Sequence, residues 1–350
     1  MIKSIFLFVI MLVLIYGHGL QSKSPGYTNE YSDPDNFAKV TENIKISFPK
    51  DYGAHPKFRT EWWYITANLT NSKGKQFGIQ WTLFRSALNP KQVNEGWESN
   101  QIWMGHTALT TAKSHFFSEK FARGGVGQAG VNISPFKAWI DDWTFAGDWE
   151  NSSLKASGDH FSYDLALSST KPVVLHGESG VSQKSFEGTK SYYYSQPFFK
   201  IEGSVRLDGR THNVVGKGWA DREWSSEIIS DSQIGWNWLG LHLDDGSKIM
   251  VFEVKGDKTN SFFSGTRIYQ NGSSKVLKPE DFTLRPLKPD SSENEDIQLH
   301  WEIIVPSEKI SINIKPVNPN AYMKTFIPYW EGPVTIDGTH TGSGYLEVTM

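Results

Sequence analysis

Short runs of aromatic and β-branched residues recur along the whole chain, and this pattern limits its possible folds more than any other feature. Gly, Asn, Asp or Pro clusters separate the runs. Residues 161–168 alternate cleanly, so that Phe161, Tyr163, Leu165 and Leu167 would share one face of a strand. No segment has the period of a long amphipathic helix. The sequence therefore predicts an all-β protein built from barrels or sandwiches.

Two pairs of runs have the spacing of β-hairpins. Turn residues at 71–74 separate the first pair, and turn residues at 244–246 separate the second. The chain has 350 residues, which suits one large β domain or two of medium size. Two similar series of strands meet near residues 200–230. We therefore expect two β domains, at residues 43–224 and 225–350.

The first 42 residues differ from the rest. Lys3 precedes an uncharged apolar run from Ile5 to Tyr16, which is shorter than the roughly 20 residues of a membrane span. Small residues at Gly17 and Gly19 suit a cleavage site. Residues 1–19 are predicted to be a signal peptide and residues 20–42 a polar linker, so we expect export to a periplasm or the extracellular space. An uncleaved anchor is the alternative.

Composition excludes several kinds of function. The net charge is −3 and no Lys/Arg block is present, which argues against nucleic-acid binding. With no cysteine, the chain has no disulfide, thiolate zinc site or Cys nucleophile. It has no HExxH motif, His triad or acidic calcium loop, so we expect no metal and no cofactor. It also lacks the GxSxG motif of a serine hydrolase.

One unusual segment, HPKFRTEWWYITANL, spans residues 55–69. Three adjacent aromatic residues follow two charged ones. Because neighbours on a strand point to opposite faces, Trp62 and Tyr64 should share one face, and Glu61 and Trp63 the other. Glu61 could line a cavity, or it could form a buried pair with Arg85 or Arg59 that fixes the geometry of a barrel.

A second such segment, GKGWADREWSSE, spans residues 216–227. Alternation places Asp221 and Glu223 on one face, and Arg222 and Trp224 on the other. Two carboxylates this close repel unless a cation or a shared proton intervenes. A raised pKa would make one of them an acid, whereas an ion pair would make it structural.

These two segments, together with FGIQWTLFRSAL, MGHTALTT, KSYYYSQPFF, GWNWLGLHLDDGSKIMVFEV and GSGYLEV, resemble the carotenoid 1,2-hydratase and AttH-type family of lipocalin-like proteins, often called predicted secreted hydrolases. The resemblance covers about residues 50–350 in order. It implies two lipocalin-like β-barrel domains packed together, with an apolar ligand cavity near their contact. It also implies chemistry without a cofactor, such as the addition of water to an isoprenoid double bond.

Two positions depart from the hydratase pattern. Arg222 stands where those enzymes have a His before Glu-Trp, and Phe252 and Glu253 stand where they have a Tyr-x-Asp pair. Arg cannot act as a proton shuttle. Glu223 and Trp224 match the family directly.

Two functions remain open from the sequence. One is an enzyme acting on a hydrophobic small molecule, isoprenoid or lipid-like, by acid-catalysed hydration or hydrolysis. The other is a non-catalytic carrier of such a molecule. The candidate catalytic residues are Glu223 and Asp221. The candidate substrate-binding residues are Trp62, Tyr64, Arg85, His106, Trp219, Arg222, Trp224 and Trp238.

Overall fold

The computed structural model describes residues 37–90, 96–227, 233–256, 261–288 and 297–349. Within these ranges the regular structure is almost entirely β-strand, and the helices are four single 3₁₀ turns: η2 (Lys50–Tyr52), η3 (Gly96–Glu98), η4 (Pro279–Asp281) and η5 (Pro306–Glu308). The prediction of an all-β protein is confirmed. None of the helices in the described ranges is long and apolar enough to cross a membrane.

The first sheet has 13 strands and is antiparallel between neighbours. Its main path runs β4-β3-β2-β1-β13-β12-β9-β8-β7-β6-β5, with β10 and β11 also paired to β12. Its strands are β1 (Thr60–Asn71), β2 (Gln76–Ala87), β3 (Gln101–Thr110), β4 (His115–Arg123), β5 (Ala129–Ile133), β6 (Phe136–Ile140), β7 (Trp143–Gly147), β8 (Asn151–Ser157), β9 (Phe161–Ser168), β10 (Val174–Leu175), β11 (Val181–Gln183), β12 (Lys190–Leu207) and β13 (Arg210–Ser225).

The second sheet has ten strands, in the order β17-β16-β15-β14-β23-β22-β20-β19-β18, with β21 paired to β22. Its strands are β14 (Gln233–Leu243), β15 (Lys248–Gly256), β16 (Phe262–Ile268), β17 (Ser274–Leu277), β18 (Thr283–Pro286), β19 (Trp301–Val305), β20 (Ile310–Pro316), β21 (Tyr322–Met323), β22 (Tyr329–Gly338) and β23 (Gly342–Thr349). Both predicted hairpins are confirmed, as β1–β2 and β14–β15.

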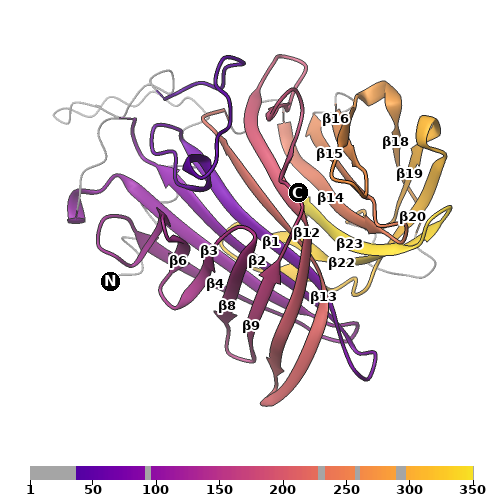
Figure 1. The fold of residues 1–350 in the computed structure, drawn as a ribbon, viewed down its shortest axis with the longest axis horizontal. Helices are drawn as coiled ribbons and strands as arrows, with labels where there is room; N and C mark the ends of the chain where they lie inside the picture. The colour runs from indigo at the N-terminus through magenta and orange to yellow at the C-terminus, as the bar shows by residue number, and fades with distance from the viewer. Residues whose placement is uncertain (1–36, 91–95, 228–232, 257–260, 289–296, 350) are drawn as a thin grey trace, which may run out of the picture.

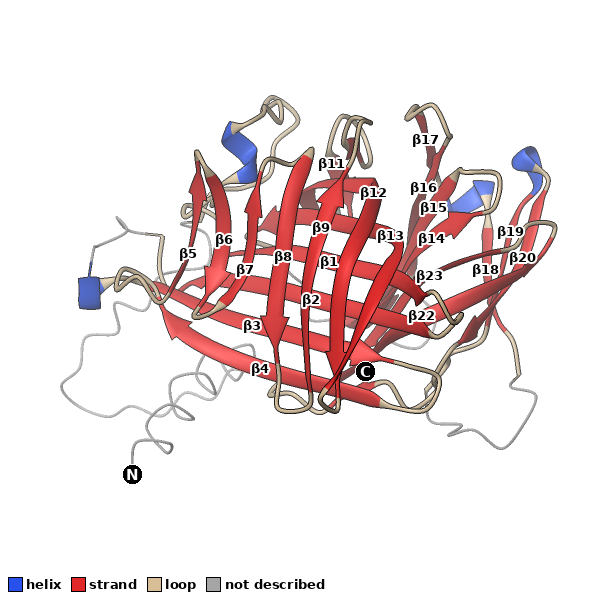
Figure 2. Cartoon of the chain, turned by 60° about the horizontal axis from the view of Figure 1, so that its bottom comes forward, coloured by secondary structure: helices blue, strands red, loops and turns tan. Residues whose placement is uncertain are grey.

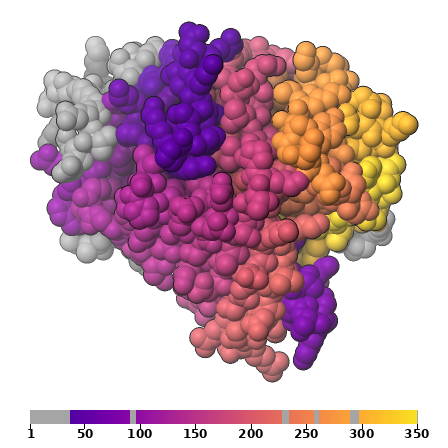
Figure 3. Space-filling view, in the orientation of Figure 1, coloured from indigo at the N-terminus to yellow at the C-terminus, as the bar shows by residue number. Residues whose placement is uncertain are grey.

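Each sheet curls around a core of its own. In the first sheet β5–β9 run across β1–β4 (Figure 2), and Trp63, Trp81, Trp143 and Phe145 fill the space between them. The second core consists mainly of aliphatic residues such as Leu239, Ile303 and Ile312, together with a few aromatic ones such as Trp330. The two curled sheets lie side by side (Figure 1) and pack directly against each other (Figure 3).

The first sheet ends at Ser225 and the second begins at Gln233. The division into domains at residues 43–224 and 225–350 stays a prediction. The predicted signal peptide lies outside the described residues. Of the predicted linker, residues 37–42 are described. They form neither helix nor strand, but Phe37 is buried and the backbone of Thr41 exchanges hydrogen bonds with the Tyr192 hydroxyl at 3.0 and 2.8 Å.

Candidate functional site between the two sheets

Pairing of β1 with β13 brings the two unusual segments together. Tyr64 lies opposite Asp221, Trp62 opposite Glu223, and Glu61 opposite Trp224. Because side chains alternate along both strands, one face of this pair points into the first core and the other points toward the second sheet. The faces are those that alternation predicts.

The face inside the first core carries a buried ion-pair cluster. Glu61 is fully buried and bonds to Arg85, to Arg222 at 2.9 Å and to His55 at 3.0 Å. Burial alone would raise the pKa of Glu61, but the charges of Arg85 and Arg222 and the hydrogen bond from His55 outweigh it and hold the pKa well below its ordinary value. Glu61 is therefore an ionised anchor for two arginines.

Three predicted substrate-binding residues belong to this inner cluster. The guanidinium of Arg222 lies 3.8 Å from the centre of the Trp63 ring, and Trp224 stacks on His55 at 4.0 Å. Arg85 also bonds to the backbone oxygens of His55 and Phe58. Arg85, Arg222 and Trp224 thus lie on the opposite face of the sheet from Asp221 and Glu223, where they join β1, β2 and β13 to the segment before β1.

The outer face meets the second sheet in an aromatic cluster, which we call the inter-sheet interface. The first sheet contributes Trp62, Tyr64, Tyr193, Phe198, Trp219 and Val174, and the second contributes Trp236, Trp238, Met250, Phe252, Val254, Phe262, Ile268 and Tyr345. Five predicted site residues meet here: Trp62, Tyr64, Trp219 and Trp238 in the aromatic cluster, and Asp221 bonded to it.

Asp221 lies at the centre of this interface and is 4% exposed. One carboxyl oxygen accepts hydrogen bonds from Ser195 and from Trp219 Nε1 at 2.5 Å, and the other accepts one from the Tyr193 hydroxyl at 2.8 Å. Burial raises the pKa of Asp221 to about 7, against the lowering effect of these three donors, and the nearby Glu223 adds to the rise. Asp221 can therefore hold or release a proton near neutral pH.

Residues of the second sheet hold the partners of Asp221 in place. Trp238 donates its indole N–H to the Tyr193 hydroxyl at 2.9 Å. His176, which follows β10 of the first sheet, bonds to Ser195 at 2.6 Å and to Thr266 of β16 in the second sheet at 2.8 Å. Burial lowers the pKa of His176 to about 3, so its ring is neutral. The environment of Asp221 therefore requires both sheets.

Glu223, the other predicted catalytic residue, has a different environment. It pairs with Lys184 at 2.8 Å and accepts a hydrogen bond from Ser191 at 2.5 Å. The Lys184 ammonium also lies 4.1 Å from the centre of the Phe252 ring. Glu223 is a paired carboxylate beside Asp221, which is the structural alternative that the sequence left open. Glu253 lies on the face of β15 opposite to Phe252 and accepts a hydrogen bond from Asn237 at 2.7 Å.

Two further carboxyls reach the interface from the second sheet, and sequence reasoning missed them. Glu331 and Glu347 are paired across β22 and β23. Burial and the charge of Glu347 raise the pKa of Glu331 well above its ordinary value, and burial, together with Asp221 and Glu223, raises that of Glu347 to about 7. Their signal in the sequence is a lone Glu inside an otherwise apolar run, in YWEGPV and GYLEV.

Tyr64 and His106 connect the first sheet to Glu331. Tyr64 donates its hydroxyl to Glu331 Oε1 at 2.5 Å. His106, a predicted site residue, bonds to the Tyr329 hydroxyl at 2.9 Å, and Tyr329 is next but one to Glu331 on the same face of β22. The interface therefore holds one group of carboxyls around Asp221 and a second around Glu331.

A groove of about 230 Å³ opens at one end of the same interface. Its walls include Asn68, Thr70 and Lys217 from the first sheet and Pro333, Thr335 and Ser343 from the second. Pro333 follows Glu331 on the same face of β22, and Thr335 lies about 13 Å from Glu331 at the usual rise of a strand. The groove therefore lies at the end of the face of β22 that carries Glu331.

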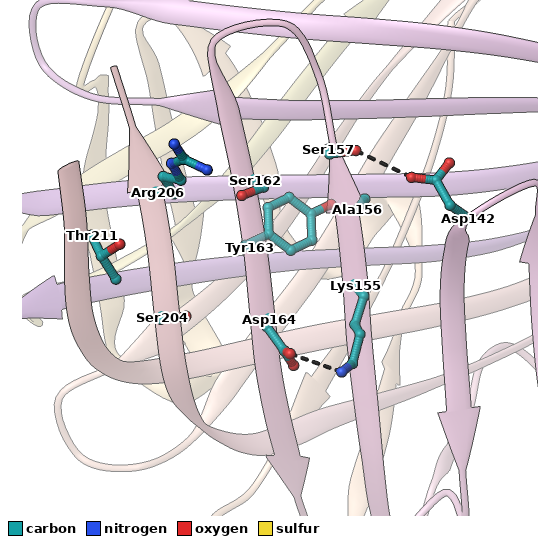
Figure 4. Close-up of a pocket in the computed structure, with 10 residues that line it drawn as sticks. All are labelled: Asp142, Lys155, Ala156, Ser157, Ser162, Tyr163, Asp164, Ser204, Arg206 and Thr211. Carbon is teal, nitrogen blue, oxygen red and sulfur yellow. Dashed lines mark hydrogen bonds and ion pairs between the residues drawn. The ribbon is translucent and has the colours of Figure 1, made fainter. Parts of the chain in front are cut away.

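A second cavity, of about 300 Å³, lies elsewhere, over β8, β9, β12 and β13 (Figure 4). Its polar lining includes the exposed pair Lys155–Asp164, at 2.8 Å, and none of the predicted site residues. Within the part of the chain that the structure describes, no cluster of His, Asp and Glu has the geometry of a metal site.

Comparison with known proteins agrees with this architecture. A sequence model of the AttH-like family matches residues 39–350. The chain belongs to the AttH-like family. The crystal structure of an AttH protein from Nitrosomonas europaea is 28% identical to it, with a TM-score of 0.78, over 89% of this chain and 99% of that one. The predicted family and the fold of two lipocalin-like domains are confirmed. No curated protein matches the sequence.

Two more distant structures share the fold of this AttH-like chain. Kievitone hydratase from Nectria haematococca is 15% identical, with a TM-score of 0.64, over 90% of this chain and 96% of that one. CghA, solved with Sch210972, is 9% identical, with a TM-score of 0.51, over 83% and 88%. At these identities the likeness concerns the fold alone.

Proposed function

We propose that this protein binds an apolar small molecule, isoprenoid or lipid-like, at the inter-sheet interface and adds water to one of its double bonds. The observation that carries the proposal is the buried carboxyl of Asp221, whose pKa of about 7 leaves a proton available at neutral pH among aromatic rings. The kievitone hydratase neighbour, a hydratase by name, supports the reaction class.

The reaction uses Asp221 first as an acid and then as a base. Its proton passes to one carbon of the double bond, and the positive charge that develops on the other carbon is stabilised by the faces of Trp62, Tyr64, Trp219 and Trp238. A water molecule that enters through the groove attacks that carbon and returns one proton to the Asp221 carboxylate. One molecule of water is added and the acid is regenerated.

The test begins with the compound that purifies with the protein. The compound is extracted, identified by mass spectrometry, and incubated with the protein in water labelled with heavy oxygen. The proposal expects one labelled hydroxyl in the product and a loss of turnover by roughly 10²–10⁴-fold in Asp221→Asn. Asp164→Asn is the matched control, because it removes a carboxylate of β9 that is exposed to solvent, paired with Lys155 and away from the inter-sheet interface.

The same experiment separates an enzyme from a carrier. Trp238→Ala should weaken binding about tenfold or more, since it removes a buried aromatic contact, while Trp97→Ala, 77% exposed, should leave binding unchanged. A compound that binds tightly and is never converted by the wild-type protein would show a carrier and overturn the proposed reaction. Unchanged turnover in Asp221→Asn would remove Asp221 as the acid.

We also propose that the protein acts after export, in a periplasm or outside the cell, on the basis of its N-terminal pattern. Sequencing the N-terminus of the protein purified from its native host tests this: a mature chain should begin near residue 20, and a chain that still begins at Met1 would contradict cleavage.

A further inference from the structure

Glu331 is a buried carboxyl at the interface between the two sheets. It is 1% exposed, and its Oε1 accepts a hydrogen bond from Tyr64 at 2.5 Å. Its second oxygen, Oε2, is buried, and no group among the described residues lies at hydrogen-bond distance and angle from it. An ionised carboxylate in such a place is costly, so the neutral acid is the stable form. A buried acid that takes part in chemistry needs a route by which its proton is exchanged.

A line of polar groups leads from Glu331 to the surface. Tyr329 lies two residues before Glu331 on the same face of β22, and its hydroxyl is close enough to the Glu331 carboxyl to lower the pKa of that carboxyl. That hydroxyl lies 2.9 Å from His106 Nδ1, and the rings of Tyr329 and His106 are stacked at 5.7 Å. His106 Nε2 lies 3.0 Å from Glu119 Oε1, where β3 pairs with β4.

Burial falls along this line in the direction of solvent. The side chain of His106 is 1% exposed and that of Glu119 is 21% exposed. Every group in the line can both accept and donate a proton, and imidazole can take a proton on one nitrogen while releasing it from the other.

We propose that Tyr329, His106 and Glu119 form a proton relay that connects the buried carboxyl of Glu331 with solvent. Glu331 gives its proton to the Tyr329 oxygen, and the Tyr329 proton passes to His106 Nδ1. His106 then releases its Nε2 proton to the Glu119 carboxylate, which passes it to water. Each group gains and loses one proton, and the reverse sequence reloads Glu331. The relay does not depend on the proposed reaction or on Asp221.

Other groups around Glu331 set its proton affinity but lie outside the relay. Glu347 faces it from β23 and Tyr64 from β1, and Asp221 and Glu223 approach from β13 through their effect on Glu347. Gln80 Nε2 approaches the Tyr329 oxygen at 3.5 Å and cannot carry a proton. Removal of His106 should therefore slow the exchange of the Glu331 proton with solvent and change the pKa of Glu331 little.

The test follows the carbonyl absorption of protonated carboxylic acids by infrared spectroscopy after a rapid change of pH. Glu331→Gln assigns the band of Glu331. His106→Gln can keep both hydrogen bonds but cannot relay a proton, and should slow the change in that band about a hundredfold at an unchanged midpoint. Glu119→Gln, a change at a partly exposed site that folding should tolerate, should slow it likewise.

His115→Gln is the matched control, because His115 lies on β4 and bonds to Thr110 at 2.9 Å, away from the relay. The relay is overturned if His106→Gln and Glu119→Gln both exchange as fast as the wild type. It is also overturned if Glu331→Gln removes no protonated-carboxyl band near neutral pH, since Glu331 would then hold no proton to relay.

Discussion

Tyr64 of the first sheet donates a 2.5 Å hydrogen bond to Glu331 of the second sheet. In the pairing of β1 with β13, Tyr64 also lies directly opposite Asp221. One tyrosine thus stands between two buried acids that come from different sheets. A carboxyl removed from water holds its proton more tightly, so packing the two sheets together is what makes these groups useful near neutral pH. The following predictions test that arrangement.

The part of the stability that Asp221 and Glu347 contribute should fall as the pH rises from about 5 to about 7. The folded protein holds protons on Asp221 and Glu347, whose pKa values rise to about 7, in a range where the unfolded chain has lost them. The stability that these groups contribute is complete below their unfolded pKa values and is lost as the pH passes about 7. Each proton contributes a slope of roughly 1.4 kcal/mol per pH unit.

Urea unfolding at several pH values measures this slope. Asp221→Asn should remove the contribution of Asp221, so that the stability of this variant falls less, or rises more, with pH than that of the wild type. Asp164→Asn should leave the shape of the wild-type curve unchanged. A difference in unfolding free energy between the wild type and Asp221→Asn that stays constant from about pH 5 to about pH 7 would show that Asp221 is ionised in the folded state.

Tyr193→Phe should raise the pKa of Asp221 further. The substitution removes the hydroxyl that donates to the carboxylate at 2.8 Å, and with it a contact that favours the ionised form. We expect a rise of about 1 to 2 in the pKa. Tyr192→Phe is the control, since that hydroxyl bonds to Thr41 on the far side of the sheet. A pKa that falls would reverse the role given to Tyr193.

Glu61→Gln should destabilise the fold by about 3–5 kcal/mol, because it leaves Arg85 and Arg222 buried without their counter-charge. Lys155→Met breaks a pair of which both side chains are more than half exposed, and should cost less than about 1 kcal/mol. Chemical denaturation compares the two. Equal losses would mean that the Glu61 cluster is not the anchor described above.

Gly78→Ala should loosen the contact between the two sheets. A Cβ atom at this position would lie 2.6 Å from Pro333 Cγ and 2.6 Å from the Tyr345 hydroxyl, both in the second sheet. We expect a loss of about 1–3 kcal/mol from this overpacking. Ser343→Ala, in the wall of the same groove, introduces no clash and should be nearly neutral. An unchanged midpoint of thermal unfolding in Gly78→Ala would show that the interface accommodates the extra methyl group without strain.

The sequence predicts the faces of β1 and β13 well because both strands are long and regular where they carry the charged and aromatic residues. It also predicts Asp221 as a candidate, since two carboxylates at this spacing are unusual. It does not separate Asp221 from Glu223. That difference comes from Lys184, which lies far along the chain and reaches Glu223 only after β12 and β13 have paired.

Other members of the site depend on contacts between distant segments. Glu331 and Glu347 follow Tyr64 by more than 250 residues, and only the packing of the two sheets brings them together. The sequence predicts Arg222 and Trp224 beside the ligand because they neighbour the acids in the chain, and Arg85 because its charge could balance that of the acids. Alternation instead places all three side chains on the inner face, in contact with Glu61 or His55 and away from the interface.

The pKa of Asp221 tests the central claim most directly. Trp219 donates its indole N–H to the Asp221 carboxylate at 2.5 Å, so the nitrogen-15 NMR signal of that indole should follow the ionisation of Asp221. The account predicts a titration with a midpoint near 7 that disappears in Asp221→Asn. A midpoint near the ordinary value of 3.8 would contradict it, because the interface would then hold an ionised carboxylate with no proton to give.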